Sequence, residues 1–186
     1  YYKPESGAPQ IRLAKIAEHL KQNGCEVRVL TALPNYPTGK IYEGYSDRKK
    51  RKEVIEGVPI IRTWIYAASG KSKIRRLINY LSFTFSSLPK LISLKWKPDL
   101  VFVEAQPITL AFTAYIYYKL RKIPYIYNTP DLQIEYAEQG KWLSFSFIFA
   151  IAKKLEKFLM KNSLSVTTVT HEFIRHFSVE RKIELK

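Results

Sequence analysis

The sequence predicts an α/β protein built around a doubly wound, mostly parallel sheet. Short runs of branched and aromatic apolar residues alternate with longer segments in which apolar residues recur at helical spacing. Glycine and proline separate these segments. With 46% hydrophobic residues among 186, the chain is large enough to bury a core. Strands that alternate with helices of this length pair in parallel, and the helices cover both faces of the sheet.

In the N-terminal half, apolar residues at helical spacing predict a helix over residues 11–23, and the glycine that follows ends it. The apolar run 26–31 predicts a strand, and the segment after it contains prolines and a glycine that predict a long loop. Residues 53–55 and 59–64 flank a glycine, which predicts two strands joined by a tight turn.

The C-terminal half continues the alternation. Residues 73–96 predict a helix with a break near Pro89, because proline lacks the N–H group that a helix interior needs. The remaining predicted elements are, in order, strand 99–104, helix 108–122, strand 124–128, helix 142–162, strand 165–169 and helix 171–177. The continuous apolar character of strand 99–104 is typical of a strand that is buried on both faces.

The composition favours an anionic partner. The chain has 31 Lys and Arg against 16 Asp and Glu, which gives a net charge of +15. Nucleic acid, an anionic membrane face or a phosphorylated substrate would all suit this excess. The single Cys25 excludes an internal disulfide and favours a reduced, cytoplasmic setting. The longest apolar runs fall short of the roughly 20 residues that span a bilayer, and the histidines show no metal-ligand spacing.

The start of the chain has the character of a ligand loop. Glu5-Ser6-Gly7 resembles in composition the glycine-containing loop that opens the first helix of a doubly wound sheet. Its backbone can face a donor diphosphate, although a simple helix-entry turn with Pro9 explains the same residues. Such a loop normally follows a central strand. Nothing long enough precedes it, so we expect that strand to be missing and the chain to be cut at both ends.

Several short motifs follow one another in order along almost the whole chain. They are residues 4–9 with Arg12, 24–27, 30–31, 34–39, 44–45, 56–58, 76–83, 97–104, 106–107 and 131–132 with Glu135. In this order they resemble the N-terminal domain of family 4 glycosyltransferases, and most closely the branch that builds O-antigen, capsule and colanic acid, which includes fucosamine transferases. The departures are Cys25, where the family usually has His, and Gln133-Ile134, where a Trp-Pro pair is usual.

The resemblance implies a Rossmann-like, acceptor-binding N-terminal half of a two-domain GT-B enzyme. Residues 1–186 would form that single domain, and the C-terminal domain that holds the nucleotide-sugar donor would be absent. The enzyme would be a retaining, hexosyltransferase-type transferase without a metal or other cofactor, active in lipopolysaccharide, capsule or exopolysaccharide synthesis. Its acceptor would be a lipid-linked glycan. The enzyme would be cytoplasmic and would lie peripherally on the inner face of the membrane. The fragment alone is expected to be inactive.

Polar residues that follow predicted strands are the candidate site. Asp131 and Glu135 are the predicted catalytic residues, because carboxylates accept hydrogen bonds from sugar hydroxyls and can take up a proton. They could instead form a capping box on a helix that starts near residue 132. Glu104 and Gln106 follow another strand and are predicted to bind the acceptor, since ligands gather at the carboxyl ends of parallel strands.

Two further segments carry predictions. In the long loop, Asn35 and Tyr36 are predicted to bind the acceptor, with an ordinary connector as the alternative. Lys73, Arg75 and Arg76 are predicted to face an anionic membrane. Helix 142–162 also combines aromatic residues with lysines, but for it we favour a core face with solvated lysines.

A noncatalytic α/β domain that binds membrane, glycan or nucleic acid is the alternative function. A nucleic-acid module should show base-stacking aromatics on one sheet face or a known recognition motif. Neither is visible in the sequence, so nucleic acid is the least favoured partner.

Overall fold

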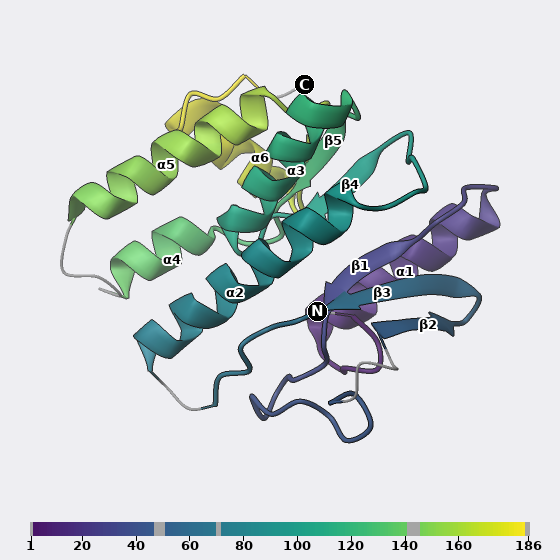
Figure 1. The fold of residues 1–186 in the computed structure, drawn as a ribbon. Helices are drawn as coiled ribbons and strands as arrows, with labels where there is room; N and C mark the ends of the chain where they lie inside the picture. Colours follow the sequence, from purple (N-terminus) through teal and green to yellow (C-terminus); the bar gives the residue numbers. More distant parts are fainter. Residues whose placement is uncertain (1, 47–50, 70–71, 141–145, 185–186) are drawn as a thin grey trace. The chain divides into compact units, whose positions relative to one another are not determined.

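The computed structural model describes residues 2–46, 51–69, 72–140 and 146–184 of the chain. The chain divides into two compact units, Tyr1–Ser93 and Leu94–Lys186, which we call the first and second unit (Figure 1).

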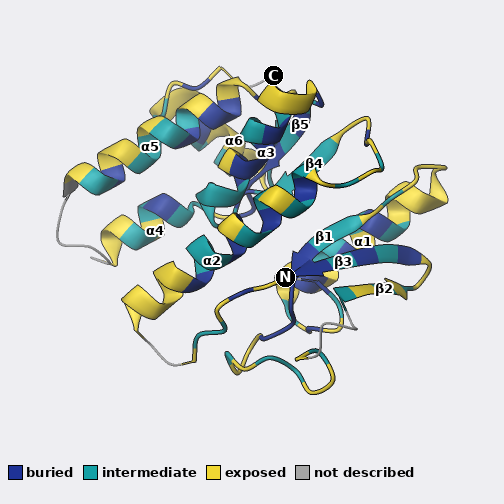
Figure 2. Cartoon of the chain, viewed as in Figure 1, coloured by how far each residue is buried: buried dark blue, intermediate teal, exposed yellow. Residues whose placement is uncertain are grey.

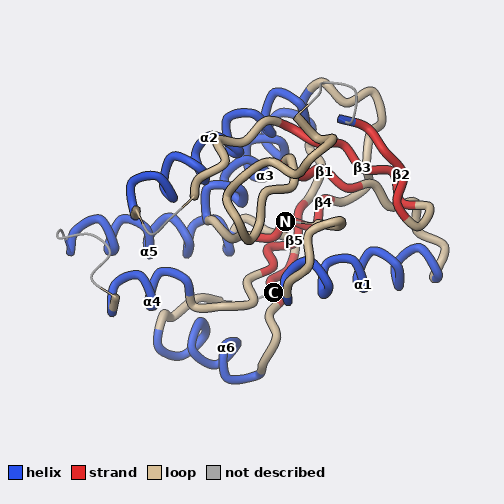
Figure 3. Tube along the Cα trace, turned by 90° about the horizontal axis from the view of Figure 1, so that it is seen from below, coloured by secondary structure: helices blue, strands red, loops and turns tan. Residues whose placement is uncertain are grey.

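The first unit contains a three-stranded mixed sheet. Its elements are helix α1 (Ala8–Gln22), strands β1 (Val29–Ala32), β2 (Lys52–Ile55) and β3 (Val58–Thr63), and helix α2 (Lys73–Ile92). The strand order is β1-β3-β2, with β1 parallel and β2 antiparallel to β3 (Figure 3). Glu56 and Gly57, which join β2 to β3, both have positive φ. This is the backbone conformation that a two-residue hairpin turn requires.

Small side chains let α1 approach the sheet closely. Ala14 and Ala17 of α1 form a buried cluster with Ile60 of β3 and with Tyr2. Helix α2 packs against β1 and β3. The sheet of the first unit therefore has helical neighbours in both α1 and α2, as the predicted alternation requires.

The second unit is built on a parallel sheet. Its strands are β4 (Val101–Glu104), β5 (Tyr125–Asn128) and β6 (Ser165–Thr167), and its helices are α3 (Ile108–Arg121), α4 (Gln133–Gln139), α5 (Ser146–Lys161), α6 (His171–Arg175) and the π-helical turn η2 (His176–Glu180). The strand order is β4-β5-β6, and both pairings are parallel.

Aromatic side chains dominate the core of the second unit. Tyr125, Tyr127, Leu159, Phe177 and Ile183 are almost completely buried (Figure 2). The Tyr125 hydroxyl donates a hydrogen bond to the backbone carbonyl of Leu159. Buried tyrosines are tolerated when the hydroxyl finds such a partner, while the ring contributes its apolar area to the core.

The predicted α/β class is confirmed, since three of the four strand pairings are parallel. The predicted break near Pro89 is wrong, because α2 runs through this residue to Ile92. A proline in the last turn removes one backbone hydrogen bond from the helix. Leu91 in the same turn is buried, and its packing offsets that loss. The predicted helix 142–162 is described only from Ser146 onward, because 142–145 lie outside the described residues.

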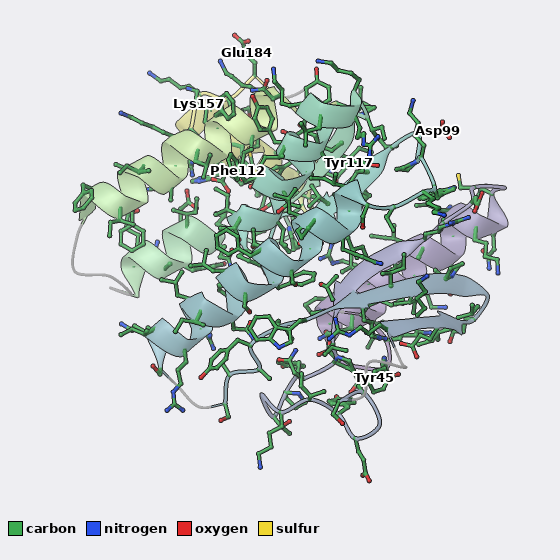
Figure 4. The ribbon with its side chains drawn as sticks, in the orientation of Figure 1. Tyr45, Asp99, Phe112, Tyr117, Lys157 and Glu184 are labelled. Carbon is green, nitrogen blue, oxygen red and sulfur yellow. The ribbon has the colours of Figure 1, made fainter. Side chains whose placement is uncertain are left out.

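One buried arginine connects most parts of the first unit. Arg62 of β3 has a fully buried side chain that forms an ion pair with Glu53 of β2. Its guanidinium also donates to the backbone carbonyls of Ala32, at 3.1 Å, and of Lys3. It lies 5.1 Å from the ring centroid of Tyr45, which is labelled in Figure 4. Arg62 therefore fixes the end of β1, the N-terminal segment and β2 around a single charge.

Replacing this arginine should destabilise the protein. We expect Arg62→Met to lower the free energy of unfolding by about 3 kcal/mol, because it leaves two carbonyls without this donor and removes the cation from the Glu53 carboxylate, which keeps the Tyr45 hydroxyl. Urea unfolding would measure the change. Arg28→Met is the matched control: the Arg28–Glu26 pair is exposed, so its loss should cost less than about 1 kcal/mol. Equal effects of the two substitutions would contradict the role given to Arg62.

Candidate functional site

A row of polar side chains crosses the carboxyl ends of the parallel strands in the second unit. Glu104 of β4, Asn128 of β5 and Thr167 of β6 are register partners. The Asn128 side-chain amide donates to the Glu104 carboxylate, and the Thr167 hydroxyl donates to the Asn128 side-chain oxygen at 3.0 Å. Because Asn128 is buried and held from both sides, its orientation, and that of Glu104, is fixed. This polar row marks the edge at which α/β sheets bind ligands.

The loop that follows β5 is attached to this edge through its backbone. The carbonyl oxygen of Asp131 accepts hydrogen bonds from the Thr129 hydroxyl at 3.0 Å and from the Gln106 side-chain amide at 3.3 Å. The Asp131 residue is exposed. The structure thus brings the predicted residues Gln106 and Asp131 together and leaves the Asp131 side chain at the surface, where it can meet a ligand.

The alternative capping-box role of Asp131 and Glu135 is wrong. Helix α4 has Leu132 as its N-cap residue and no side-chain capping bond. Asp131 precedes the N-cap residue by one position, and its carboxylate makes no capping hydrogen bond to the helix. This frees its carboxylate from the helix terminus.

Glu135 lies in a buried ionic cluster instead of at an open surface. Its carboxylate pairs with Arg181 and lies 3.3 Å from Nε2 of His176. Burial tends to raise the pKa of Glu135, but its backbone hydrogen bond, the Arg181 charge and the His176 contact outweigh burial and lower this pKa. A carboxylate held ionised by an arginine is suited to fixing α4. Its predicted catalytic role stays a prediction.

A second buried carboxylate shares the same arginine. Glu156 of α5 lies 2.9 Å from Nη2 of Arg181 and accepts a hydrogen bond from the Tyr127 hydroxyl at 3.3 Å. Burial raises the pKa of Glu156 to about 7; the Arg181 charge opposes this shift and the Glu135 charge adds to it. His176 further contacts Glu180 at 2.7 Å. The single positive charge of Arg181 faces the carboxylates of both Glu135 and Glu156 and cannot neutralise both. The cluster therefore favours a proton on Glu156.

In the first unit, a buried carboxylate organises the long loop. Glu5 accepts hydrogen bonds from the backbone N–H groups of Asn35 at 2.7 Å, Tyr36 at 2.8 Å and Tyr2 at 3.3 Å. The Asn35 side chain is itself buried and donates to the carbonyl of Leu33. Glu5 and Asn35 therefore position the loop, and Tyr36 is the exposed member of the predicted acceptor pair.

Gly7 stands where the start of α1 meets this loop. It is the N-cap residue of α1 and has an extended backbone. A Cβ atom at this position would lie 2.6 Å from Oε1 of Gln10 and 3.3 Å from a ring carbon of Tyr36. Gln10 is buried, and its Oε1 has no hydrogen-bond partner among the described residues. Close approach explains the glycine, and an open pocket of about 360 Å³ lined in part by Lys3, Ser6 and Gln10 adjoins it.

The predicted membrane-facing residues lie on an exposed helix end. Lys73, Arg75 and Arg76 belong to the first two turns of α2, and all three are exposed. Ile74 and Leu77 of the same turns are 72% and 50% exposed. These turns therefore present cationic and apolar side chains together.

Some residues of the site were missed from the sequence. Asn128 ends a predicted strand, so the rule that selected Glu104 could have found it. Arg181 and His176 carry no local signal, because their partner Glu135 lies 46 and 41 residues away along the chain.

Comparison with known proteins identifies the family of this domain. Residues 7–182 match the family model of the glycosyl transferase 4-like domain. The chain belongs to this family. Over 100 residues it is 35% identical to the Escherichia coli (strain K12) protein named "Putative colanic acid biosynthesis glycosyl transferase WcaI". That match covers 53% of the chain and 24% of the relative, so the aligned part spans about a quarter of the relative's length.

Membership in the glycosyl transferase 4-like family confirms the resemblance drawn from the order of the motifs. Within the described part of this domain, no helix is long and apolar enough to cross a membrane. The same residues contain no group of three or more His, Cys, Asp or Glu side chains placed to hold a metal ion.

The ionic cluster makes stability depend on pH. The raised pKa of Glu156, about 7 against an ordinary 4.5, means that the folded state binds a proton more tightly than the unfolded state. Its stabilising contribution is complete below about pH 4.5 and is lost as the pH rises through 7. Relative to Glu156→Gln, the wild-type free energy of unfolding should fall by on the order of 3 kcal/mol over that range.

Urea unfolding at several pH values between 5 and 7.5 would measure this difference. Glu138→Gln is the control, because the Glu138–Lys153 pair is more exposed and should add little pH dependence. A difference between wild type and Glu156→Gln that stays constant across this range would show that Glu156 does not hold a proton.

Proposed function

We propose that this glycosyl transferase 4-like domain is the acceptor-binding half of a retaining GT-B glycosyltransferase. The whole enzyme moves a hexosyl unit from a nucleotide-sugar to a lipid-linked glycan during cell-surface polysaccharide synthesis, and a separate domain holds the donor. Family membership supports sugar transfer. The relative named for colanic acid biosynthesis supports the polysaccharide class.

The placement of Asp131 is the observation that carries this proposal. Its backbone carbonyl is fixed by Gln106 and Thr129, and the residue is exposed beside the polar row at the carboxyl ends of β4 and β5. A fixed backbone with an exposed carboxylate suits a residue that must orient an acceptor hydroxyl and take up its proton. Glu104 and Gln106 line the same edge and would hydrogen-bond neighbouring hydroxyls of the acceptor.

Glu135 supports this role indirectly. It lies four residues after Asp131, on α4, and Arg181 holds its carboxylate ionised. Anchoring α4 in this way limits the positions available to the Asp131 loop. We therefore assign the proton-accepting role to Asp131 and a positioning role to Glu135.

The loop residues of the first unit have separate tasks. Tyr36 has an exposed ring that can pack on an apolar sugar face, while Asn35 and Glu5 hold the loop in shape. Ser6 and Gly7, at the start of α1, would face the donor diphosphate through the N-terminal end of the helix.

Removing the Asp131 carboxylate should abolish most of the transfer. In the full-length protein we expect Asp131→Asn to lower kcat by about 10²-fold or more, because general base catalysis contributes on that scale. Sugar transfer to a lipid-linked acceptor would be measured alongside Tm. Asp99→Asn is the matched control: Asp99 is also exposed, but it precedes β4 at the amino end (Figure 4).

Asp99→Asn should transfer sugar at the wild-type rate. Full activity in Asp131→Asn would remove Asp131 from the mechanism. A complete lack of transfer in the wild-type protein, with glycan binding retained, would favour the noncatalytic alternative.

We further propose that the enzyme is a cytoplasmic, peripheral protein of the inner membrane face. The first two turns of α2 support this location, since Lys73, Arg75 and Arg76 are interleaved with the exposed Ile74 and Leu77. Cations attract anionic headgroups, and the apolar side chains can enter the interface.

Neutralising these three cations should weaken vesicle binding. Each lysine or arginine near an anionic surface is worth about 1 kcal/mol, so the triple substitution K73Q/R75Q/R76Q should reduce binding to phosphatidylglycerol vesicles roughly hundredfold at low salt. Vesicle co-sedimentation would measure it, with K15Q/K21Q/R28Q as a charge-matched control on the same unit. Equal losses in both variants would show that total charge, not the α2 surface, attracts the protein.

A further inference from the structure

Helix α5 of the second unit has a mixed apolar and cationic outer face. Phe147, Ile151, Lys154, Phe158 and Lys161 are spaced alternately four and three residues apart, so they lie on one side of the helix. All five are exposed, with Phe147 at 60%, Ile151 at 58% and Phe158 at 43%. We call these five residues the α5 outer face.

The opposite side of α5 already supplies the core. Phe149, Glu156, Leu159 and Met160 are buried, and Leu159 and Met160 belong to the core cluster of the unit (Figure 2). The opposite side of α5 therefore seats the helix in the core, while the residues of the α5 outer face stay largely exposed, although Phe158 also contacts Tyr115 of α3. The sequence favoured a core face with solvated lysines for this helix, and the structure shows that its aromatic residues are divided between the two sides.

The apolar area continues onto the neighbouring helix α3. The Phe158 ring meets the Tyr115 ring edge-on at 4.9 Å, and Tyr115 stacks on Phe112 at 6.4 Å. Phe112, labelled in Figure 4, is itself 41% exposed. Contiguous exposed apolar area of this kind marks an interaction surface more often than chance exposure.

The exposed charges on α3 and α5 themselves are positive, and the neighbouring helix α4 adds Glu138, which pairs with Lys153 of α5. Glu156 is the only acidic residue of α5, and it is buried on the opposite side of the helix. Helix α3 contains no acidic residue and ends with Lys119 and Arg121. Lys154 and Lys161 stand directly among the apolar side chains of the α5 outer face.

This combination selects the kind of partner. An apolar protein surface would bury Lys154 and Lys161 with the phenylalanines and would have to supply carboxylates at both places, because unpaired buried charge is costly. The surface of an anionic bilayer meets both requirements at once: the rings enter the interface, and the lysines extend toward the phosphates.

We propose that the α5 outer face is a second lipid-contacting surface, separate in sequence from the start of α2 and directed at anionic phospholipid. It goes beyond the proposed transfer reaction and does not depend on it. Because it uses aromatic anchors as well as charge, its binding to vesicles resists salt better than binding through lysines alone.

Vesicle flotation of the full-length protein would test this surface, using phosphatidylglycerol–phosphatidylcholine vesicles and pure phosphatidylcholine vesicles. We expect F147S/I151S to lose at least about tenfold in binding to the anionic vesicles at both low and moderate salt. K154Q/K161Q should lose about fivefold per lysine, mainly at low salt. Val169→Ser together with Ile174→Ser is the matched control, since both are exposed outside α3 and α5, and it should bind as the wild type does.

Thermal unfolding of the same variants shows whether they fold, and an unchanged Tm is expected because both replaced side chains point outward. Wild-type binding by F147S/I151S overturns the proposal, even if the α2 variant binds poorly. A dimer that dissociates in F147S/I151S also overturns it, because that result means that a second copy covers the face. None of these readouts involves sugar transfer.

Discussion

One arginine in each unit, fully buried in the first unit and mostly buried in the second, is the constraint on which the described ion pairs depend. Taking an arginine charge out of water costs several kcal/mol, so the charge persists only where carboxylates and carbonyls surround it. Arg62 draws Glu53, Ala32 and Lys3 together in the first unit. Arg181 does the same for Glu135, Glu156 and the Lys153 carbonyl in the second. The segments that satisfy each arginine are thereby fixed, including the loops at the strand ends.

This constraint separates two kinds of carboxylate in the candidate site. Glu5 and Glu135 are buried or nearly so; Glu5 accepts from backbone N–H groups, and Oε1 of Glu135 is held by Arg181. Asp131 is held only through its backbone, so its side chain remains available. The first kind shapes the loops, and the second can meet a substrate. A catalytic residue placed on a rigid edge loses less entropy when it orients a substrate hydroxyl.

The sequence could predict the elements of the fold but not the pairs that position the site. Local apolar runs predict strand 124–128, and the residues at its carboxyl end are then expected to face a ligand. Gly57 predicts the hairpin turn between residues 53–55 and 59–64. The pairs Glu5–Asn35 and Glu135–Arg181 join residues 30 and 46 positions apart, and periodicity carries no information at that range. Pro89 shows the converse: a strong local signal was overridden, because the packing of Leu91 outweighs one lost hydrogen bond.

The same pairs also explain how the net charge of +15 is distributed. Glu5, Glu53, Glu135 and Glu156, four of the 16 acidic residues, are occupied by internal partners. Helices α2 and α3 contain no acidic residue, and α5 contains only the buried Glu156. Helices α2, α3 and α5 therefore carry exposed cations, whereas Glu104 ends β4 and Asp131 lies in the loop after β5. An anionic partner is attracted to the helices, and the sugar hydroxyls meet carboxylates, so lipid contact and acceptor chemistry need not compete for one surface.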